Sequence, residues 1–276
     1  SCSAARESIM LGRAMFIAAS NADTSWTPSQ IATALWLDAA DSSTVTTSSG
    51  AVSQWNDKSG NNRHATQSTA GSRPAYTSGG LNQKNVITFN GSTTYLDCPD
   101  IVMTGYEWTA ISVFSMSANA QNSARYLSAS SSLSSQDWNT SAAWVIIYRN
   151  SSANEIGTFY SMAAVNLYNV SLDQALLHSV TRRSSSFVSY LNGGSSLTSS
   201  SSISSLNTAA GLRIGRSINP PYETNETWSG YSAEIIIAQN LDTTNRQKLE
   251  GYLAWKWGLA SNLPGDHPYK NSAPTG

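Results

Sequence analysis

Carboxylates, hydroxyls and imidazoles are the side chains through which this sequence could carry hydrolytic chemistry. Cleaving a glycosidic bond requires two carboxyl groups facing the same bond, one as acid and the other as nucleophile or base. The nearest acidic candidates stand isolated along the chain: Glu155, Glu223, Glu226 and Glu234. Glu234 lies in a strand-like alternation, but no second acid stands two positions away on its face. We interpret Glu234 as a solvated or locally paired strand residue.

Nucleophilic hydrolysis is not indicated either. The sequence contains no Gly-x-Ser-x-Gly elbow that would present a serine to a histidine and an acid. The three histidines, His64, His178 and His267, are too dispersed for zinc-ligand spacing, and no glycine-rich phosphate loop or dinucleotide motif occurs. The sequence therefore predicts no catalytic residue and a protein that is not an enzyme.

Calcium is the one cofactor for which the sequence offers candidate ligands. Calcium prefers oxygen ligands from Asp, Asn and backbone carbonyls in loops. Four candidate ligands are Asp38, Asn56, Asp57 and Asn61. Against a calcium site, no EF-hand loop is present, and Asx residues in turns normally bond to their own backbone. Both interpretations remain open, and no other cofactor is indicated.

Aromatic residues offer a second kind of site. The chain has nine Trp and twelve Tyr, whose ring faces can cover the apolar side of a pyranose while polar neighbours bind its hydroxyls. The aromatic residues nearest to expected loops are Trp138, Trp144, Tyr222 and Trp228. The alternative is that they belong to the core, as most aromatic residues of a β-sandwich do. The carbohydrate-binding hypothesis rests on these four side chains.

The charge balance limits the partners. Charged residues make up only 12% of the chain, and 16 basic against 17 acidic side chains leave a net charge of -1. This composition excludes electrostatic recruitment of nucleic acid. Low charge with abundant Ser, Thr, Asn and Gly is typical of extracellular or virion β proteins. Cys2 and Cys98 are too few for a disulfide framework and are interpreted as unrelated thiols, with a link from Cys2 to a neighbouring subunit as the alternative.

Residues 1–30 are interpreted as an N-terminal arm and linker, and residues 31–276 as one domain. The apolar stretch 9–19 is too short to span a bilayer, so no membrane insertion is expected. We expect it to dock onto a partner, with packing on its own domain as the alternative. The docking side chains would be Met10, Leu11, Met15, Phe16 and Ile17.

One helix is predicted near the C-terminus. Asp242 or Thr243 can cap its first free N–H groups, and Gly258 ends it. Four apolar side chains fall at i, i+3, i+4 and i+8, so one stripe of this helix can lie on a core: Leu249, Tyr252, Leu253 and Trp257. Trp255 lies off this stripe and is expected to cover the helix flank or a neighbouring subunit.

Short alternating segments separated by turn residues fill the rest of the chain. They include a strand at 31–39, another at 52–55, and an expected hairpin across Asn90-Gly91 that joins 86–89 to 94–96. No βαβ alternation supports a parallel sheet. The pattern predicts an all-β fold, a two-sheet antiparallel jelly-roll sandwich with one short C-terminal helix.

Several of these segments resemble a known family. The stretches 35–39 (LWLDA), 52–60 (VSQWNDKSG), 86–91 (VITFNG) and 251–259 (GYLAWKWGL) are similar to concanavalin A-like, laminin-G-like jelly rolls of bacteriophage virion proteins. The resemblance implies two facing antiparallel sheets. Glycosidases of this fold share the strand motif Glu-x-Asp-x-x-Glu, which is absent here.

The resemblance implies a non-enzymatic virion structural protein, a capsid decoration or head-fibre subunit held by its N-terminal arm. Its partners would be other virion proteins and further copies of itself, and its location the virion surface, extracellular when released. The first alternative is a tail-fibre receptor-binding or lectin-like module that recognises host-surface carbohydrate. The second is a polysaccharide-degrading enzyme whose site the sequence does not reveal.

Overall fold

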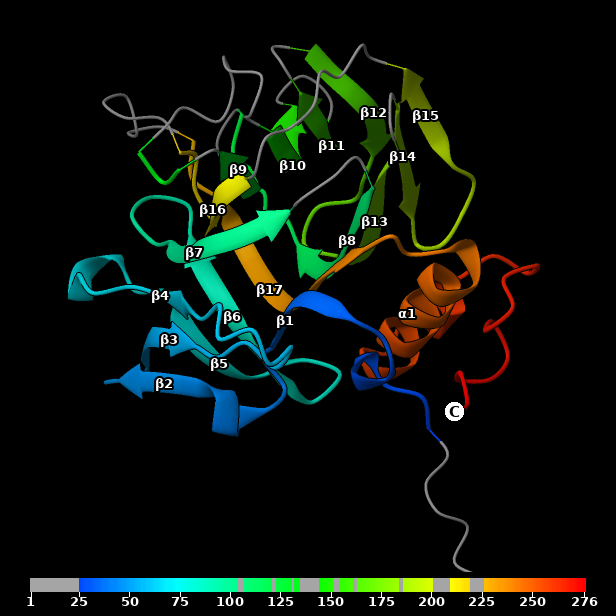
Figure 1. Cartoon of the computed structure of the whole chain (residues 1–276). Helices are drawn as coiled ribbons and strands as arrows, with labels where there is room; N and C mark the ends of the chain where they lie inside the picture. The colour runs from blue at the N-terminus through cyan, green and yellow to red at the C-terminus, as the bar shows by residue number, and fades with distance from the viewer. Residues whose placement is uncertain are drawn as a thin grey trace, which may run out of the picture.

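In the computed structural model the described residues form mostly β-strands, together with one α-helix (Figure 1). The residues that it describes are 25–103, 107–120, 123–130, 132–134, 144–150, 154–160, 163–183, 186–200, 209–218 and 226–276. Cys2 and the expected docking arm (Met10, Leu11, Met15, Phe16 and Ile17) lie outside these ranges, and Cys98 is a buried thiol whose Sγ donates to Arg63 O at 3.0 Å.

Seventeen strands are found in the described ranges. They are β1 (Thr33–Asp38), β2 (Val45–Ser48), β3 (Ala51–Trp55), β4 (Ala65–Thr66), β5 (Ala75–Leu81), β6 (Lys84–Asn90), β7 (Leu96–Met103), β8 (Trp108–Ser115), β9 (Arg125–Ser130), β10 (Trp144–Asn150), β11 (Glu155–Tyr160), β12 (Ala163–Asn169), β13 (Ala175–Arg183), β14 (Ser186–Leu191), β15 (Leu197–Ser200), β16 (Ala209–Ile214) and β17 (Ser229–Gln239). The helices are α1 (Thr243–Lys256) and four 3-10 turns, η1 (Pro28–Gln30), η2 (Ser42–Thr44), η3 (Ala70–Ser72) and η4 (Ala260–Asn262).

All strand pairings between these elements are antiparallel, and they fall into two layers. One layer runs β15–β14–β13–β8–β17, and β17 then pairs along its other edge with β6 and β1. The other runs β12–β11–β10–β9–β16–β7–β4–β3–β2. Pairing of β5 with both β6 and β3 joins the layers at one edge. The predicted antiparallel sandwich is confirmed.

The strand β8 shows why the chain forms layers. All its residues are buried, but alternate side chains enter different clusters. Trp108, Ala110 and Phe114 face the space between the two layers, whereas Ile111 and Val113 face away from it, toward α1. Because both faces of this strand are covered, its sequence is apolar throughout, as expected for a central strand.

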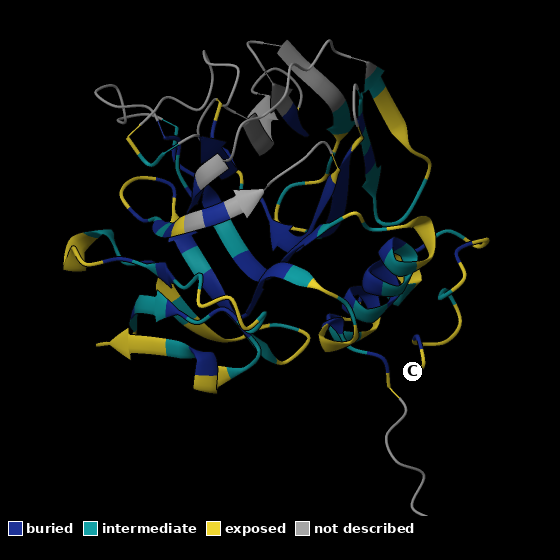
Figure 2. Ribbon diagram, in the orientation of Figure 1, coloured by how far each residue is buried: buried dark blue, intermediate teal, exposed yellow. Residues whose placement is uncertain are grey.

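The helix α1 covers the outer face of the first layer. Asp242 caps it, accepting a hydrogen bond from Asn245 N at 2.7 Å, and Gly258 follows it at φ +75°. Its buried stripe, visible in Figure 2, includes Leu249 and Leu253 and continues into Trp257. The predicted caps and apolar stripe are therefore confirmed.

The chain on either side of Asn90 does not form the expected hairpin. The β6 strand, which ends at Asn90, pairs with β5 and β17, whereas β7 pairs with β16 and β4 in the other layer. The side chain of Asn90 accepts hydrogen bonds from the backbone N–H of Ser92 and Thr93, which coils the connection. The Asn-Gly pair therefore makes a crossing between layers, and the hairpin prediction is wrong.

The domain begins before residue 31. Ser25 forms a β-bridge with Thr275, and Trp26 N donates to Pro274 O at 3.1 Å. The Trp26 ring is 3% exposed and packs edge-on against Tyr252, with 6.3 Å between ring centroids. Residues 25–30 are thus part of the packed domain, because one large aromatic side chain outweighs the polar composition that suggested a linker.

The interior contains a histidine that is not paired. His178 on β13 is 1% exposed, and within the described residues neither of its ring nitrogens has a hydrogen-bond partner. Burial lowers the pKa of His178 from 6.5 to about 4. Between these two values the unfolded chain binds a proton that the folded chain does not bind, so the free energy of unfolding decreases as the pH falls through this range.

We expect acidification from neutral pH to about pH 4 to cost the protein on the order of 3 kcal/mol through His178. A His178→Leu variant lacks the titrating ring, so its stability should depend less on pH over the same interval. Urea unfolding of both proteins at several pH values measures the difference. Equal pH slopes for the two proteins would show that His178 does not titrate in this way.

Candidate functional site

A row of polar side chains crosses the second layer at right angles to its strands. Strand register places these residues directly beside one another on β2, β3, β4, β7, β16 and β9. We call this set the polar row: Thr46, Gln54, Thr66, Asp97, Arg213 and Ser128. The strands that carry it follow one another up the left side of Figure 1.

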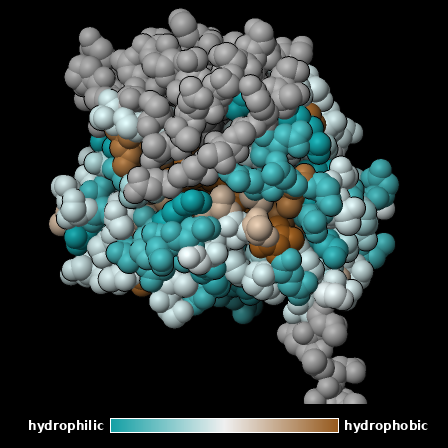
Figure 3. Space-filling model, in the orientation of Figure 1, coloured by the Kyte–Doolittle hydropathy of each residue, from teal (hydrophilic) through white to brown (hydrophobic). Residues whose placement is uncertain are grey.

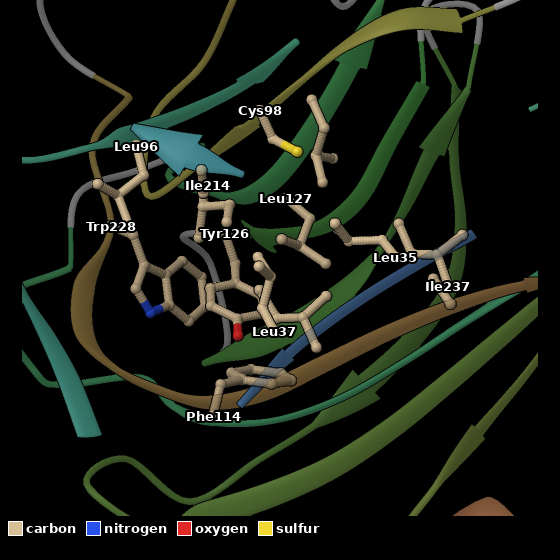
Figure 4. Packing of buried hydrophobic residues seen from close by; sticks show 14 of the residues in the cluster. Leu35, Leu37, Leu96, Cys98, Phe114, Tyr126, Leu127, Ile214, Trp228 and Ile237 are labelled. Atoms are coloured by element: carbon tan, nitrogen blue, oxygen red, sulfur yellow. The ribbon is translucent and has the colours of Figure 1, made fainter. Parts of the chain in front are cut away.

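Alternation along the strands turns the polar row away from the core. Leu96 and Cys98, on either side of Asp97, are fully buried between the layers, where Figure 4 shows them. Leu212 and Ile214 flank Arg213 in the same way. Because neighbouring side chains of a strand point to opposite faces, Asp97 and Arg213 lie on the outer face of this layer.

A groove of about 370 Å³ lies along the exposed half of the polar row. A different groove, of about 400 Å³, lies elsewhere on the surface and contains none of the row's residues. The groove of about 370 Å³ is lined by Gln54, Thr66 and Asp97 of the row and by Tyr95, Arg73 and Gln67 beside it. The surface over β2, β3 and β4 is mostly hydrophilic or neutral (Figure 3). We call it the Tyr95 groove.

The wall of the Tyr95 groove is fixed by side chains that bond to backbone. Arg73 donates from Nε to Gln67 O at 2.9 Å and from Nη2 to Ser68 O at 3.0 Å. Gln67 in turn donates from Nε2 to Tyr95 O at 3.2 Å. These bonds hold the loop after β4 against β7, so the groove is preformed.

An ion pair forms the centre of the polar row. Arg213 contacts Asp97 in a bidentate arrangement, Nε to Oδ1 at 2.7 Å and Nη2 to Oδ2 at 3.2 Å. The guanidinium of Arg213 also lies 4.4 Å from the centroid of the Tyr95 ring, and that of Arg216 lies at 5.3 Å. The Arg213 side chain is 6% exposed and that of Asp97 is 26% exposed, so the carboxylate faces the groove.

The buried end of the row contains polar atoms without partners. Arg213 donates from Nη1 to Ser217 O at 3.2 Å, and Ser217 N donates to Glu226 O at 3.2 Å. Glu226 Oε1 lies 3.3 Å from Arg125 Nη2. Within the described ranges, Ser128 Oγ, Ser217 Oγ and Glu226 Oε2 are buried and make no hydrogen bond. A bound hydroxyl-rich molecule or water would satisfy such atoms.

Arg213 therefore connects the Asp97 carboxylate at the groove with the backbone of Ser217, which in turn bonds to the backbone of Glu226. Hydroxyl, amide, carboxylate and guanidinium groups alternate along the row, and this mixture of donors and acceptors matches the hydroxyl groups of a saccharide. The arrangement offers a polar ligand a set of hydrogen-bonding groups together with the Asp97 carboxylate.

Two other grooves have a different character. The groove of about 400 Å³ near Asn61 and Arg63 offers neither an aromatic ring nor a carboxylate, and both side chains already bond to backbone carbonyls of β1. The groove of about 430 Å³ near Tyr190 has Arg246 in its wall, and that guanidinium is paired with the buried Glu250. The Tyr95 groove is therefore the stronger candidate.

The aromatic residues predicted to bind sugar do not line the Tyr95 groove. Trp228 is fully buried between the layers, where its Nε1 donates to Ser115 O at 2.9 Å. In Figure 4 its ring lies beside Tyr126 and Phe114. Trp138 and Tyr222 fall outside the described residues, as does the side chain of Trp144 on β10. Trp228 is a core residue because its flat ring fills the space between the layers.

The four predicted calcium ligands are spread along β1 and the loop that follows β3, and they have other partners. Asp57 accepts hydrogen bonds from the backbone N–H of Trp36, Ser59 and Arg63. The remaining three are also engaged: Asp38 with Lys58 and Lys256, Asn56 with Gln54, and Asn61 with Thr33 O. In the described part of the chain, no three His, Cys, Asp or Glu side chains gather as metal ligands do. Calcium binding stays a prediction.

Glu234 is paired, as one interpretation held, but it is not solvated. Its side chain is 0% exposed and accepts from Trp36 Nε1 and Trp257 Nε1, both at 2.8 Å. Burial and then the neighbouring charge of Asp38 raise the pKa of Glu234. Of the other acids, Glu155 begins β11 and Glu223 is outside the described residues. Glu226 is linked to the polar row through Ser217, since its backbone oxygen accepts from Ser217 N and Arg213 donates to Ser217 O.

Sequence reasoning missed Gln54, Thr66, Asp97 and Arg213. A signal existed at two of these positions, since Asp97 and Arg213 each stand between buried apolar residues and must face outward. The sequence does not show that they are neighbours, because 116 residues separate them. Among the described helices, none has the length and apolar character needed to cross a bilayer.

No protein-family model and no curated protein match this chain. Solved structures do match. An arabinofuranosidase complexed with arabinofuranosyl-α-1,2-xylobiose matches with a TM-score of 0.54 and 13% identity, over 72% of this chain and 50% of that one. A Trypanosoma rangeli sialidase in complex with sialic acid matches with a TM-score of 0.52 and 12% identity, over 80% of this chain and 33% of that one. At these identities the likeness shows the fold, and this chain spans half or less of each enzyme.

These matches overturn the expectation of a bacteriophage virion protein. The matching structures named above are carbohydrate-processing enzymes, so the virion structural role, its tail-fibre alternative and the expectation of a non-enzyme are corrected together. The physical reason is visible in the fold. The stretches 86–91 and 251–259 that carried the resemblance lie in β6 and α1, which build the scaffold, and one scaffold serves many functions.

Proposed function

We propose that this chain acts in glycoside processing and that the polar row with the Tyr95 groove is its saccharide-binding surface. The observation that supports this most directly is the continuous row of hydrogen-bonding side chains across six strands, ending in buried atoms that have no partner in the described residues. The fold it shares with an arabinofuranosidase and a sialidase agrees with this class of ligand.

The geometry favours a saccharide over other polar ligands. The groove presents a carboxylate, two carboxamides and several hydroxyls at one surface, and sugar hydroxyls both donate and accept. The Asp97–Arg213 pair has opposite charges that compensate each other, so the row does not select an anion or a cation. Because the side chains stand on paired strands, little conformational freedom is lost when a ligand binds.

Asp97 and Glu226 are the carboxylates proposed to face the scissile bond. Each is in contact with an arginine, Asp97 with Arg213 and Glu226 with Arg125, and carboxylates serve glycoside hydrolysis as nucleophile, base or electrostatic stabiliser. Glu226 has one buried oxygen, Oε2, without a hydrogen-bond partner in the described residues, and a ligand hydroxyl that reached it would satisfy this atom. Saccharides as the substrate class are part of this proposal. So is an extracellular location, which the composition of the chain led us to expect.

The test compares binding and hydrolysis across matched variants. The probes are arabinofuranosyl-xylobiose and a sialoside, with glycan-array screening for other saccharides. Replacing Asp97 by Asn should weaken binding roughly 10- to 100-fold, since a hydrogen bond to a charged group contributes about 1.5–3 kcal/mol. Release of reducing sugar should fall in Asp97→Asn and Glu226→Gln.

Two controls separate this surface from the rest of the protein. Asp173→Asn makes the same chemical change at an exposed turn and should leave binding unchanged. Gln54→Ala should weaken binding, whereas Gln247→Ala, in the groove near Tyr190, should not. Folded protein with no saccharide binding and no hydrolysis would refute the proposal, as would binding lost in Gln247→Ala but kept in Asp97→Asn.

A further inference from the structure

A lysine lies between two carboxylates under the end of α1. Lys256 Nζ is 2.7 Å from Asp38 Oδ1 and 2.6 Å from Glu234 Oε2. The three side chains are 15%, 5% and 0% exposed, respectively. No residue of this cluster takes part in the polar row.

Strand pairing creates the cluster. Asp38 ends β1 and is directly opposite Glu234 on β17, so the two carboxylates lie side by side on the face that α1 covers. Lys256 is the last residue of α1, and its ammonium reaches down between them. Two adjacent buried carboxylates repel each other, and the ammonium of Lys256 offsets this repulsion. The same repulsion favours protonation of one of the two carboxylates.

Glu234 is held from three sides. The indole N–H groups of Trp36 and Trp257 each donate to it at 2.8 Å, and Tyr252 Oη lies 3.3 Å from Oε1. Lys256 Nζ is also 3.1 Å from Tyr252 Oη. The carboxyl group of Glu234 therefore has a fixed orientation toward the amine. Burial, followed by the charge of Asp38, raises its pKa and favours its protonated form.

Asp38 has a second cationic neighbour on its other oxygen. Lys58 Nζ lies 3.0 Å from Asp38 Oδ2 and 2.8 Å from Asp41 Oδ2. Although burial lowers the pKa of Lys58, its bond to Asp41 and the charge of Asp38 raise it overall, so Lys58 remains an ammonium ion. A cation on Oδ2 withdraws electron density from the Asp38 carbonyl carbon and makes it more electrophilic.

We propose that this cluster is a self-modification site, at which Lys256 Nζ forms an isopeptide bond with the side-chain carbonyl carbon of Asp38. In this reaction Glu234 accepts a proton from the Lys256 ammonium, and the resulting amine attacks Asp38 Cγ. The Cγ–Oδ1 bond breaks as the departing oxygen takes two protons, the one that Glu234 returns and a second that the newly bonded nitrogen gives up, so that it leaves as water. An ammonium and a carboxylate thus become one amide and one water molecule, and neither an oxidant nor a co-reactant is needed.

The local surroundings suit such a condensation. Lys256 Nζ already lies 2.7 Å from the Asp38 carboxylate that it would attack, which lowers the entropic barrier of a bimolecular step. Apolar side chains of the cluster beneath α1 exclude water, which would favour the reverse reaction. The product would replace an ion pair by a neutral amide and would join β1 covalently to α1, which are far apart in the sequence.

The decisive experiment is the mass of the intact full chain under denaturing conditions. The wild-type protein should be lighter than its sequence mass by one water molecule. Trypsin should release residues 14–58 joined to residues 249–270, because cleavage after an amidated Lys256 is blocked. A wild-type mass equal to the sequence mass would overturn the proposal, and so would a water loss whose cross-link maps to any other pair of residues.

Three variants define the roles. Lys256→Arg keeps the charge without a nucleophilic amine and should have the full sequence mass. Glu234→Gln removes the proton acceptor, so the full mass is expected there also. Lys58→Arg is the matched control, because it keeps a cation on Asp38 and should still lose water. Water loss that persists in Lys256→Arg, or disappears in Lys58→Arg, would refute the assignment of the bond to Lys256. Undiminished cross-linking in Glu234→Gln would refute the role of Glu234.

Discussion

Replacing Trp228 by Ala is expected to lower the free energy of unfolding by about 3–5 kcal/mol, a large part of the stability of an ordinary domain. The Trp228 ring is fully buried, with its centroid 5.4 Å from that of Tyr126 and 5.7 Å from that of Phe114. Truncation would leave a cavity between the layers and would strip Ser115 O of its indole donor. Urea unfolding measured by circular dichroism gives the change.

The exposed Trp255 provides the matched control for this substitution. It is 41% exposed and donates from Nε1 to Tyr269 O at 2.9 Å, so Trp255→Ala should cost about 1.5 kcal/mol or less. A smaller loss in Trp228→Ala than in Trp255→Ala would mean that Trp228 is not a core residue. That result would return it to the set of exposed rings available to a sugar.

Replacing Glu250 by Ala should be comparably destabilising, by about 3–5 kcal/mol, because it leaves a buried arginine without its counter-charge. Glu250 is fully buried and receives Arg246 Nη1 at 2.5 Å and 2.6 Å, Ser179 Oγ at 2.7 Å and His267 Nε2 at 3.3 Å. It therefore connects α1, β13 and the C-terminal segment through one carboxylate. Most of the expected loss of stability comes from leaving the Arg246 guanidinium buried without a counter-charge, and the ion pair itself contributes a smaller part.

Asp266 provides the control that tests whether burial of Glu250 is the cause of the expected loss of stability. It is exposed in the groove next to His267, and Asp266→Ala should change the free energy of unfolding by no more than about 0.5 kcal/mol. Glu250→Gln should fall between the two, because it keeps the shape and part of the hydrogen bonding. Equal effects of Glu250→Ala and Asp266→Ala would contradict the structural role given to Glu250.

The polar row and the buried lysine cluster place chemistry on opposite sides of the same sandwich. Asp97 and Arg213 stand on the outer face of the second layer, whereas Asp38 and Glu234 stand on the outer face of the first, under α1. The two tests are independent, because losing the isopeptide bond would change the mass of the protein without touching the Tyr95 groove.

The sequence by itself determined the elements that depend on near neighbours. Asp242 caps α1 and Gly258 ends it, since both effects operate within one turn. Alternating apolar residues fixed the strands and the sandwich class, because period-two patterning directly reports which face is buried. The failed hairpin at Asn90 shows the limit of this local logic: the turn was identified, but its partner strand was not.

Only the tertiary structure decided which residues meet. Asp97 and Arg213, 116 residues apart, become a bidentate pair through the register of β7 and β16. Lys256 meets Asp38 because α1 packs over the edge where β1 and β17 pair. Burial likewise made Trp228 a core residue although its neighbours in sequence suggested a loop. Local alternation of residues predicts which face of a strand a side chain is on. Strand register and burial arise from the packing of the whole chain, and the polar row and the Lys256 cluster both depend on register and burial.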